Sequence, residues 1–170
     1  MTESDAEGRK ELFAWFGGAA YHAQCFEVEL HTLLIFIHRL KNPTMTPDGV
    51  EHIDTRLSKK NLGFLIQELK RTGEMHPDFE ALLDEYREKR NYLMHRFFFE
   101  NSYKLLSKEG CEAMVEELQA IADSLREADE IAKLMSKNVR EHLGLNEQWV
   151  EEYVRKAILN ETGYDIDKTT

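Results

Sequence analysis

The segment CEAMVEELQAIADSLREADEIAKLM, residues 111–135, decides the fold of this chain. Its apolar residues recur at alternating steps of three and four, which is the period of one face of an α-helix. They are Cys111, Met114, Leu118, Ile121, Leu125, Ala128, Ala132 and Met135. An apolar stripe of this length needs neighbouring helices to cover it, so the segment predicts a long helix inside a bundle.

Similar patterns on both sides of this segment predict further helices. A long one covers residues 10–40, and shorter ones cover 57–71, 78–99 and 146–158. The connections between the later helices are short, which favours antiparallel neighbours. The predicted fold class is therefore all-α, an antiparallel four-helix-type bundle with an additional C-terminal helix.

Glycine, proline and capping residues set the expected helix boundaries. Gly73 is expected to end the helix over 57–71, and Asp78 is expected to cap the helix that follows. Two prolines and a glycine within residues 41–54 predict a loop there. The pair Gly17-Gly18 interrupts the first helix and predicts either a bend or a close backbone contact.

The composition is that of one globular domain. The chain has 170 residues, of which 42% are hydrophobic and 32% are charged, and this length is sufficient for a core without disulfides or metals. We expect a single bundle domain over residues 10–160, between a flexible N-terminus (1–9) and a frayed tail (161–170).

The ends and the cysteines indicate a cytoplasmic protein. The first ten residues are acidic and polar and lack the apolar region of a secretory signal. The longest apolar run, residues 33–37, is far too short to cross a bilayer, so no membrane association is expected. Cys25 and Cys111 fall inside predicted helices, where free cysteine usually behaves as a small apolar residue in a reducing compartment.

One position breaks the apolar stripe of the helix predicted over 78–99. Arg90 stands where the next apolar residue is expected; the stripe itself consists of Phe79, Leu83, Tyr86, Leu93 and Phe97. A guanidinium keeps its charge, so partial burial requires a carboxylate, backbone carbonyls or a bound anion. Glu27, at the flank of the first helix's stripe, is the candidate partner.

Two more polar residues follow Arg90 on the same helix. Asn91 and His95 are four residues apart and share a face, whereas Arg90 and His95 are five apart, about 140° around an ideal helix. A flexible arginine, a distorted helix end or a second copy of the helix across a two-fold axis would each bring them together. We expect the third arrangement, a homodimer.

The pattern of Arg90, Asn91 and His95 on the third helix of a small bundle resembles the signature of the HEPN superfamily. The sequences of residues 61–66 and 97–99 are also similar to those of some bacterial members. The resemblance implies a metal-independent endoribonuclease without a cofactor, which in this superfamily is often a toxin or an anti-phage effector. It covers the motif and the order of the helices.

The resemblance also implies roles for these residues. His95 would act as the base or acid that moves the protons, and His95 of a second copy would take the complementary role. Arg90 would hold the phosphate, and Asn91 would orient either group through a hydrogen bond. Arg96 and Tyr103 are candidate substrate-binding residues. The expected product is a 2′,3′-cyclic phosphate.

A second interpretation is a catalytically silent interaction module of the same fold. In that case Arg90 forms a structural ion pair, His95 is an ordinary histidine at a helix end, and aromatic surfaces bind a protein partner such as an antitoxin. The net charge of −10 favours this interpretation, because affinity for nucleic acid comes mainly from Lys and Arg.

The remaining candidate residues stay open between two roles. The run Phe97-Phe98-Phe99, with Tyr103, would either stack RNA bases or belong to the core or a dimer contact. The face of the helix over 146–158 would dock on the bundle, close a dimer or receive a partner. No histidine has a glutamate three residues before it, which disfavours a di-metal site, and the pair Glu27 and His31 is interpreted as a solvated helical pair.

Overall fold

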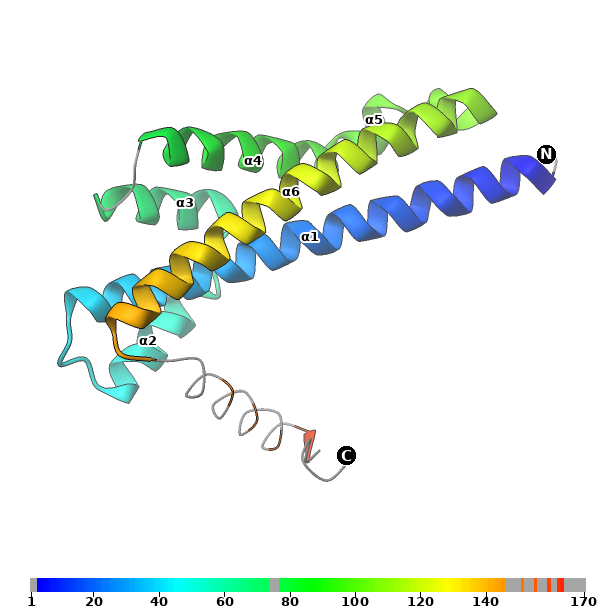
Figure 1. Cartoon of the computed structure of the whole chain (residues 1–170). Helices are drawn as coiled ribbons and strands as arrows, with labels where there is room; N and C mark the ends of the chain where they lie inside the picture. Colours follow the sequence, from blue (N-terminus) through cyan, green and yellow to red (C-terminus); the bar gives the residue numbers. More distant parts are fainter. Residues whose placement is uncertain are drawn as a thin grey trace.

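The computed structural model describes residues 3–73 and 77–145, together with residues 151, 155, 159, 162 and 163. Within these ranges every regular element is a helix (Figure 1), which confirms the all-α class. The elements are α1 (Glu3–Lys41), α2 (Pro47–Leu57), α3 (Leu62–Arg71), α4 (Pro77–His95), α5 (Phe97–Glu100), the 3-10 helix η1 (Lys104–Leu106) and α6 (Lys108–His142). The helix predicted over 146–158 and the predicted tail lie almost entirely outside the described residues.

The two long helices, α1 and α6, lie side by side and run in the same direction (Figure 1). The first half of α1 packs with the first half of α6, and their second halves pack together likewise. Helix α4 runs in the opposite direction, because Lys89 contacts Ser124 whereas Tyr92, one turn later, contacts the earlier Glu117. The bundle thus combines one parallel pair with an antiparallel α4.

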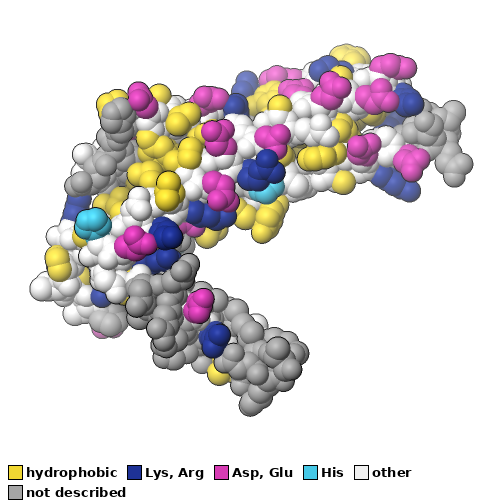
Figure 2. Space-filling view, viewed as in Figure 1, with side chains coloured by type: hydrophobic (Ala, Val, Ile, Leu, Met, Phe, Trp, Pro, Cys, Tyr) yellow, Lys and Arg dark blue, Asp and Glu magenta, His cyan; other side chains and the backbone are white. Residues whose placement is uncertain are grey.

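The apolar stripe of residues 111–135 forms the centre of the core, as predicted. Its members from Cys111 to Ala132 are buried, and Met135 is partly buried. The stripe joins two clusters, one around Leu12, Leu93 and Phe97, and another that α1, α2, α3 and α4 share with the second half of α6. Figure 2 shows that other apolar side chains lie at the surface among charged ones. No helix in the described part of the chain is long and apolar enough to cross a membrane.

Helix α2 occupies part of residues 41–54, so the predicted loop is wrong there. The Thr46 side chain accepts a hydrogen bond from the Gly49 N–H at 3.3 Å and caps the helix, and Pro47 follows as its first residue. Proline suits this position because its fixed φ is helical and its missing N–H would have no partner. The residues that indicated a loop therefore begin a helix, and Leu57 anchors its end in the core.

The boundaries of all three helices predicted over 10–40, 57–71 and 78–99 differ from the predictions. Helix α1 begins at Glu3 and so includes most of the segment predicted as a flexible N-terminus. The helix predicted over 57–71 is divided, because α2 ends at Leu57 and Asn61 caps α3 by accepting from the Phe64 N–H at 2.9 Å. Asp78 lies inside the first turn of α4 and is not its cap, and that helix ends at His95 before the short α5. Gly73 ends α3 with a φ of 69°, as expected.

The close backbone contact expected at Gly17-Gly18 does not occur. Helix α1 passes through both residues, and a Cβ added at either would meet no atom within 4 Å. The close approach occurs at Gly110 in the first turn of α6, where a Cβ would overlap the carbonyl oxygen of Lys104.

Alanine substitutions should therefore have opposite effects at these two kinds of glycine. We expect Gly110→Ala to lower the free energy of unfolding by about 1–3 kcal/mol, because backbone atoms must move. Gly18→Ala should raise it by up to about 1 kcal/mol, because alanine is the better helix former. Urea denaturation followed by circular dichroism measures both, and a destabilised Gly18→Ala variant would contradict the open space seen around that residue.

His38, near the end of α1, predicts a pH dependence of stability. Burial and then the nearby Arg56 guanidinium lower the pKa of His38, while Glu68 opposes them. The unfolded chain therefore binds a proton at His38 more readily than the folded chain does. The contribution of neutral His38 to the free energy of unfolding is complete above about pH 6.5 and is lost as the pH falls. We expect the difference in melting temperature between wild type and His38→Gln to shrink from about pH 7.5 to about pH 5.5. An unchanged difference would exclude this contribution.

Candidate functional site

The motif residues of α4 meet Glu27 of α1 in one cluster. The Nε of Arg90 donates to Oε1 of Glu27 at 2.6 Å, which confirms the predicted pairing. The Nη1 atom of Arg90 donates to Oδ1 of Asn91 at 3.3 Å and lies 3.4 Å from Nε2 of His95. Side-chain exposures of 23% for Arg90 and 26% for Glu27 leave the ion pair half-buried. His95 is exposed to solvent.

A single chain brings Arg90 and His95 together, so the second copy favoured above is not required for this contact. Two of the alternatives combine here. The long arginine side chain extends along the helix, and His95 is the last residue of α4, followed by Arg96 with φ −126° and ψ −23°. The imidazole therefore lies where the regular helix ends and can turn toward the guanidinium.

The contact between Arg90 and His95 has a chemical consequence. A guanidinium nitrogen only donates, so a hydrogen bond to Nε2 requires the neutral histidine tautomer that carries its proton on Nδ1. In that form the Nε2 lone pair faces Nη1 of Arg90, and it can accept a proton from a substrate hydroxyl once the guanidinium turns from the imidazole to a bound phosphate. The arginine is aimed by Glu27 through Nε, while Nη1 points to the exposed imidazole. The cluster thus holds a proton acceptor beside a fixed positive charge.

A second network holds the end of α4 against α6. The hydroxyl of Tyr92 donates to Oε1 of Glu117 at 2.6 Å and accepts from Nδ2 of Asn101 at 3.0 Å. The same Asn101 amide donates to the carbonyl of Phe97 at 2.9 Å. Burial, followed by the hydrogen bond to Glu117, raises the pKa of Tyr92, so the phenol keeps its proton. Sequence patterns did not single out this network, which joins residues far apart along the chain.

The two candidate substrate-binding residues do not join the cluster. The Arg96 guanidinium lies over the Tyr92 ring, 5.5 Å from its centroid, and pairs with Glu100 at 3.5 Å. Tyr103 is 86% exposed, just before η1. Both are accessible, but none of these interactions connects them to Arg90 or His95.

The aromatic run after the motif divides between core and surface. Phe97 is fully buried, and Phe98 stacks obliquely against Phe16 with ring centroids 4.8 Å apart. Phe99 is 83% exposed. The core interpretation therefore holds for the first residue of the run, whereas Phe99 is available to a ligand or a partner.

The histidine and carboxylate pairs elsewhere are accounted for by local contacts. Glu27 is occupied by Arg90, and Nε2 of His31 lies 3.1 Å from Oδ1 of Asp54 on α2. Glu27 and His31 are therefore engaged separately and form no joint site. Among the residues that the structure describes, no group of three or more His, Cys, Asp or Glu side chains could hold a metal ion. The cysteines Cys25 and Cys111 are both free thiols.

Comparison with known proteins yields no match to a family model, to a curated protein or to a solved structure. The function must consequently be inferred from the motif residues and from the cluster that the fold builds with them.

Proposed function

We propose that this protein is a metal-independent endoribonuclease of the HEPN type, acting in the cytoplasm as a toxin or defence effector. The observation that carries the proposal is the approach of Arg90 Nη1 to His95 Nε2, at 3.4 Å, on an exposed helix end. Among the described residues no carboxylate pairs with this imidazole. A guanidinium and an imidazole placed together in this way suit a bound phosphate better than they suit stability.

The proposed chemistry assigns one step to each side chain. His95 accepts the ribose 2′-hydroxyl proton, and the freed oxygen attacks the adjacent phosphorus. The P–O bond to the 5′-oxygen breaks, and that oxygen takes a proton from a second imidazole, His95 of the other copy in a homodimer. Arg90 stabilises the charge that develops on the phosphorane oxygens, and Asn91 orients Arg90 through its Oδ1 atom. The products are a 2′,3′-cyclic phosphate and a 5′-hydroxyl.

The alternative is a silent interaction module, and one observation favours it. The ion pair between Arg90 and Glu27 already gives the guanidinium a partner without any substrate. A half-buried arginine paired across two helices is a common structural feature. In this alternative, exposed aromatic residues such as Phe99 and Tyr103 bind a protein partner such as an antitoxin.

The experiment that decides between them is cleavage of a mixed RNA substrate by the purified protein in the presence of EDTA. Cleavage that leaves 2′,3′-cyclic phosphate ends, together with a dimer by analytical ultracentrifugation, is the expected result. Absence of cleavage at every protein concentration would favour the interaction module. Cleavage that EDTA abolishes would exclude the metal-independent chemistry.

A further inference from the structure

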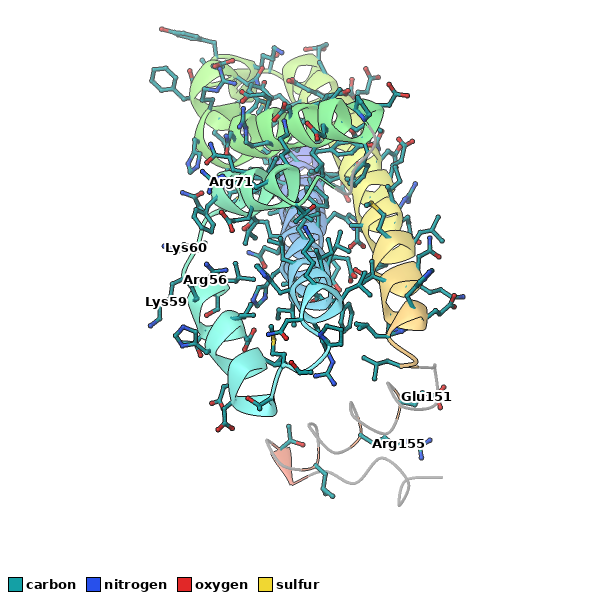
Figure 3. All side chains as sticks on the ribbon, turned by 90° about the vertical axis from the view of Figure 1, so that its left-hand side faces the viewer. Arg56, Lys59, Lys60, Arg71, Glu151 and Arg155 are labelled. Carbon is teal, nitrogen blue, oxygen red and sulfur yellow. The ribbon has the colours of Figure 1, made fainter. Side chains whose placement is uncertain are left out.

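Three cations gather where α2 ends and α3 begins, and we call Arg56, Lys59 and Lys60 the basic edge. Figure 3 shows these side chains along one side of the molecule. Residues 55–67 contain no Asp or Glu, although the whole chain has 32 acidic side chains in 170 residues, or about one in five. The basic edge is thus a local exception in a protein with a net charge of −10.

No carboxylate in the described part of the chain pairs with the basic edge. Most other cations of the bundle have such a partner, for example Lys70 with Asp84 at 2.6 Å. Among the described residues, the Arg56 guanidinium hydrogen-bonds to Nε2 of His38 at 3.4 Å and to no carboxylate, and Lys60 lies over the Phe64 ring, 4.9 Å from its centroid. The positive charge of the basic edge is therefore not neutralised by these described residues.

Helix stability does not explain where two of these cations lie. Lys59 and Lys60 come directly before Asn61, the N-cap of α3, and the first turn of that helix holds no acidic residue. The N-terminal end of a helix is the positive end of its dipole, so cations there oppose folding slightly. Arg56, in the last turn of α2, is placed favourably for its own helix. The two lysines thus increase the positive potential at the start of α3, where they do not favour the dipole of that helix.

The basic edge is followed directly by α3, which packs against the motif helix α4. Gly63, in the first turn of α3, packs against α4, because a Cβ there would lie 3.9 Å from Cδ of Arg87. Arg87 is three residues, or roughly one helical turn, before Arg90. Arg87 pairs with Glu88 and Asp84, which neutralise its charge. It therefore shows where α3 meets α4 but adds little to the positive charge of the basic edge.

We propose that the basic edge binds the phosphate backbone of single-stranded RNA and guides the strand to Arg90 and His95; this inference rests on the proposed ribonuclease function. The neighbouring exposed side chains are polar, namely Thr55, Ser58 and Asn61. Hydroxyl and amide side chains beside Lys and Arg are the groups that contact phosphates. Protein interfaces instead depend on buried aromatic anchors, and the exposed residues of 55–61 include no aromatic side chain.

The test is the affinity of the full chain for a fluorescein-labelled single-stranded RNA, measured by anisotropy at several KCl concentrations with EDTA. All proteins carry His95→Ala, so that the probe stays intact. Adding Lys59→Glu and Lys60→Glu should weaken binding at least about tenfold at 0.1 M salt, and should reduce the salt slope by roughly 0.7 for each phosphate that is no longer bound. Neutral Lys59→Gln and Lys60→Gln should give an intermediate decrease in affinity.

A matched control separates a local site from the overall charge. The control variant carries Lys108→Glu and Arg126→Glu. Each reversal changes the net charge by two, so the net charge falls from −10 to −14, as it does in the variant of the basic edge. These exposed residues of α6 pair within that helix, with Glu112 and Asp123 respectively. The control should change the affinity less than about threefold, since surface charges distant from the bound strand act weakly at this ionic strength. Equal decreases in both proteins would overturn the proposal.

Three further outcomes would overturn the proposal or separate it from the ribonuclease function. If polyglutamate displaces the probe as effectively as unlabelled RNA does, the basic edge binds acidic protein chains and the proposal is wrong. RNA binding that depends on Lys59 and Lys60, in a protein whose wild type does not cleave, would refute the proposed function and leave the edge intact. Cleavage by wild type with no effect of the reversals would refute the edge alone.

Discussion

Replacing either Arg90 or His95 with alanine should lower the rate of RNA cleavage by about 10²- to 10³-fold. Loss of His95 removes the proton acceptor, and loss of Arg90 removes the donor that stabilises the phosphorane. The measurement is a single-turnover cleavage rate in EDTA, with circular dichroism and sedimentation to show that each variant keeps its helices and its oligomeric state.

Matched substitutions make this prediction specific to the cluster. Arg126→Ala and His142→Ala remove the same residue types from exposed positions of α6 and should cleave at the wild-type rate. Arg90→Lys keeps the charge near Glu27 but cannot contact Glu27, Asn91 and His95 from one planar group, so it should remain folded and inactive. Wild-type cleavage by Arg90→Lys would contradict the geometry proposed for Arg90.

In the proposed reaction Glu27 acts through Arg90, as a positioning residue. Glu27→Gln should reduce the cleavage rate by roughly tenfold, because an amide holds the guanidinium with a weaker, uncharged hydrogen bond. Glu27→Asp tests the role of the charge: partial rescue relative to Glu27→Gln indicates positioning. Equal decreases in stability in both variants with no change in rate would assign Glu27 a purely structural role.

Phe97→Ala should lower the free energy of unfolding by about 3–5 kcal/mol, whereas Phe99→Ala should change it by less than about 0.5 kcal/mol. Phe97 is fully buried between α1 and α6 and contacts the rings of Phe16 and Tyr92, so its removal leaves a cavity. Phe99, two residues later, extends into solvent. Urea denaturation followed by far-ultraviolet circular dichroism compares the two directly.

The same pair of variants also tests the surface of the motif segment. If Phe99 stacks on RNA bases, Phe99→Ala weakens RNA binding without loss of stability, by about 1–3 kcal/mol for a stacked base. Similar decreases in stability for Phe97→Ala and Phe99→Ala would contradict the division of this aromatic run between core and surface.

The contact between Arg90 and Glu27 was predictable because a charged residue interrupts an apolar stripe at Arg90. Arg90 replaces an apolar residue on a core-facing stripe, and a partly buried guanidinium needs a carboxylate, backbone carbonyls or an anion, so Glu27 was a candidate at the flank of the partner stripe. The approach of His95 was not predictable, because side chains five residues apart on an ideal helix point away from each other. The end of α4 at His95 and the reach of the arginine side chain changed that geometry.

The predictions of the fold were wrong where one residue type is common in two kinds of structure. Pro47 and Gly49 indicated a loop, but proline is also favoured as the first residue of a helix, and Thr46 supplies the cap. The charged residues of the basic edge were not predictable as a site, because each is ordinary alone. Their significance depends on which carboxylates lie near them, which is a matter of distance and not of order along the chain.

The sequence by itself determined that the chain is helical, which positions of residues 111–135 are buried, and that a partly buried Arg90 needs a partner for its charge. These follow from a period of 3.6 residues and from the cost of burying a charge, both of which are local. Only the tertiary structure decided that α1 and α6 run in parallel, that Arg90 meets His95 within one chain, and that α3, which follows the basic edge, packs against α4. Apolar stripes cover one another equally well in either direction, so packing over the whole bundle makes that choice.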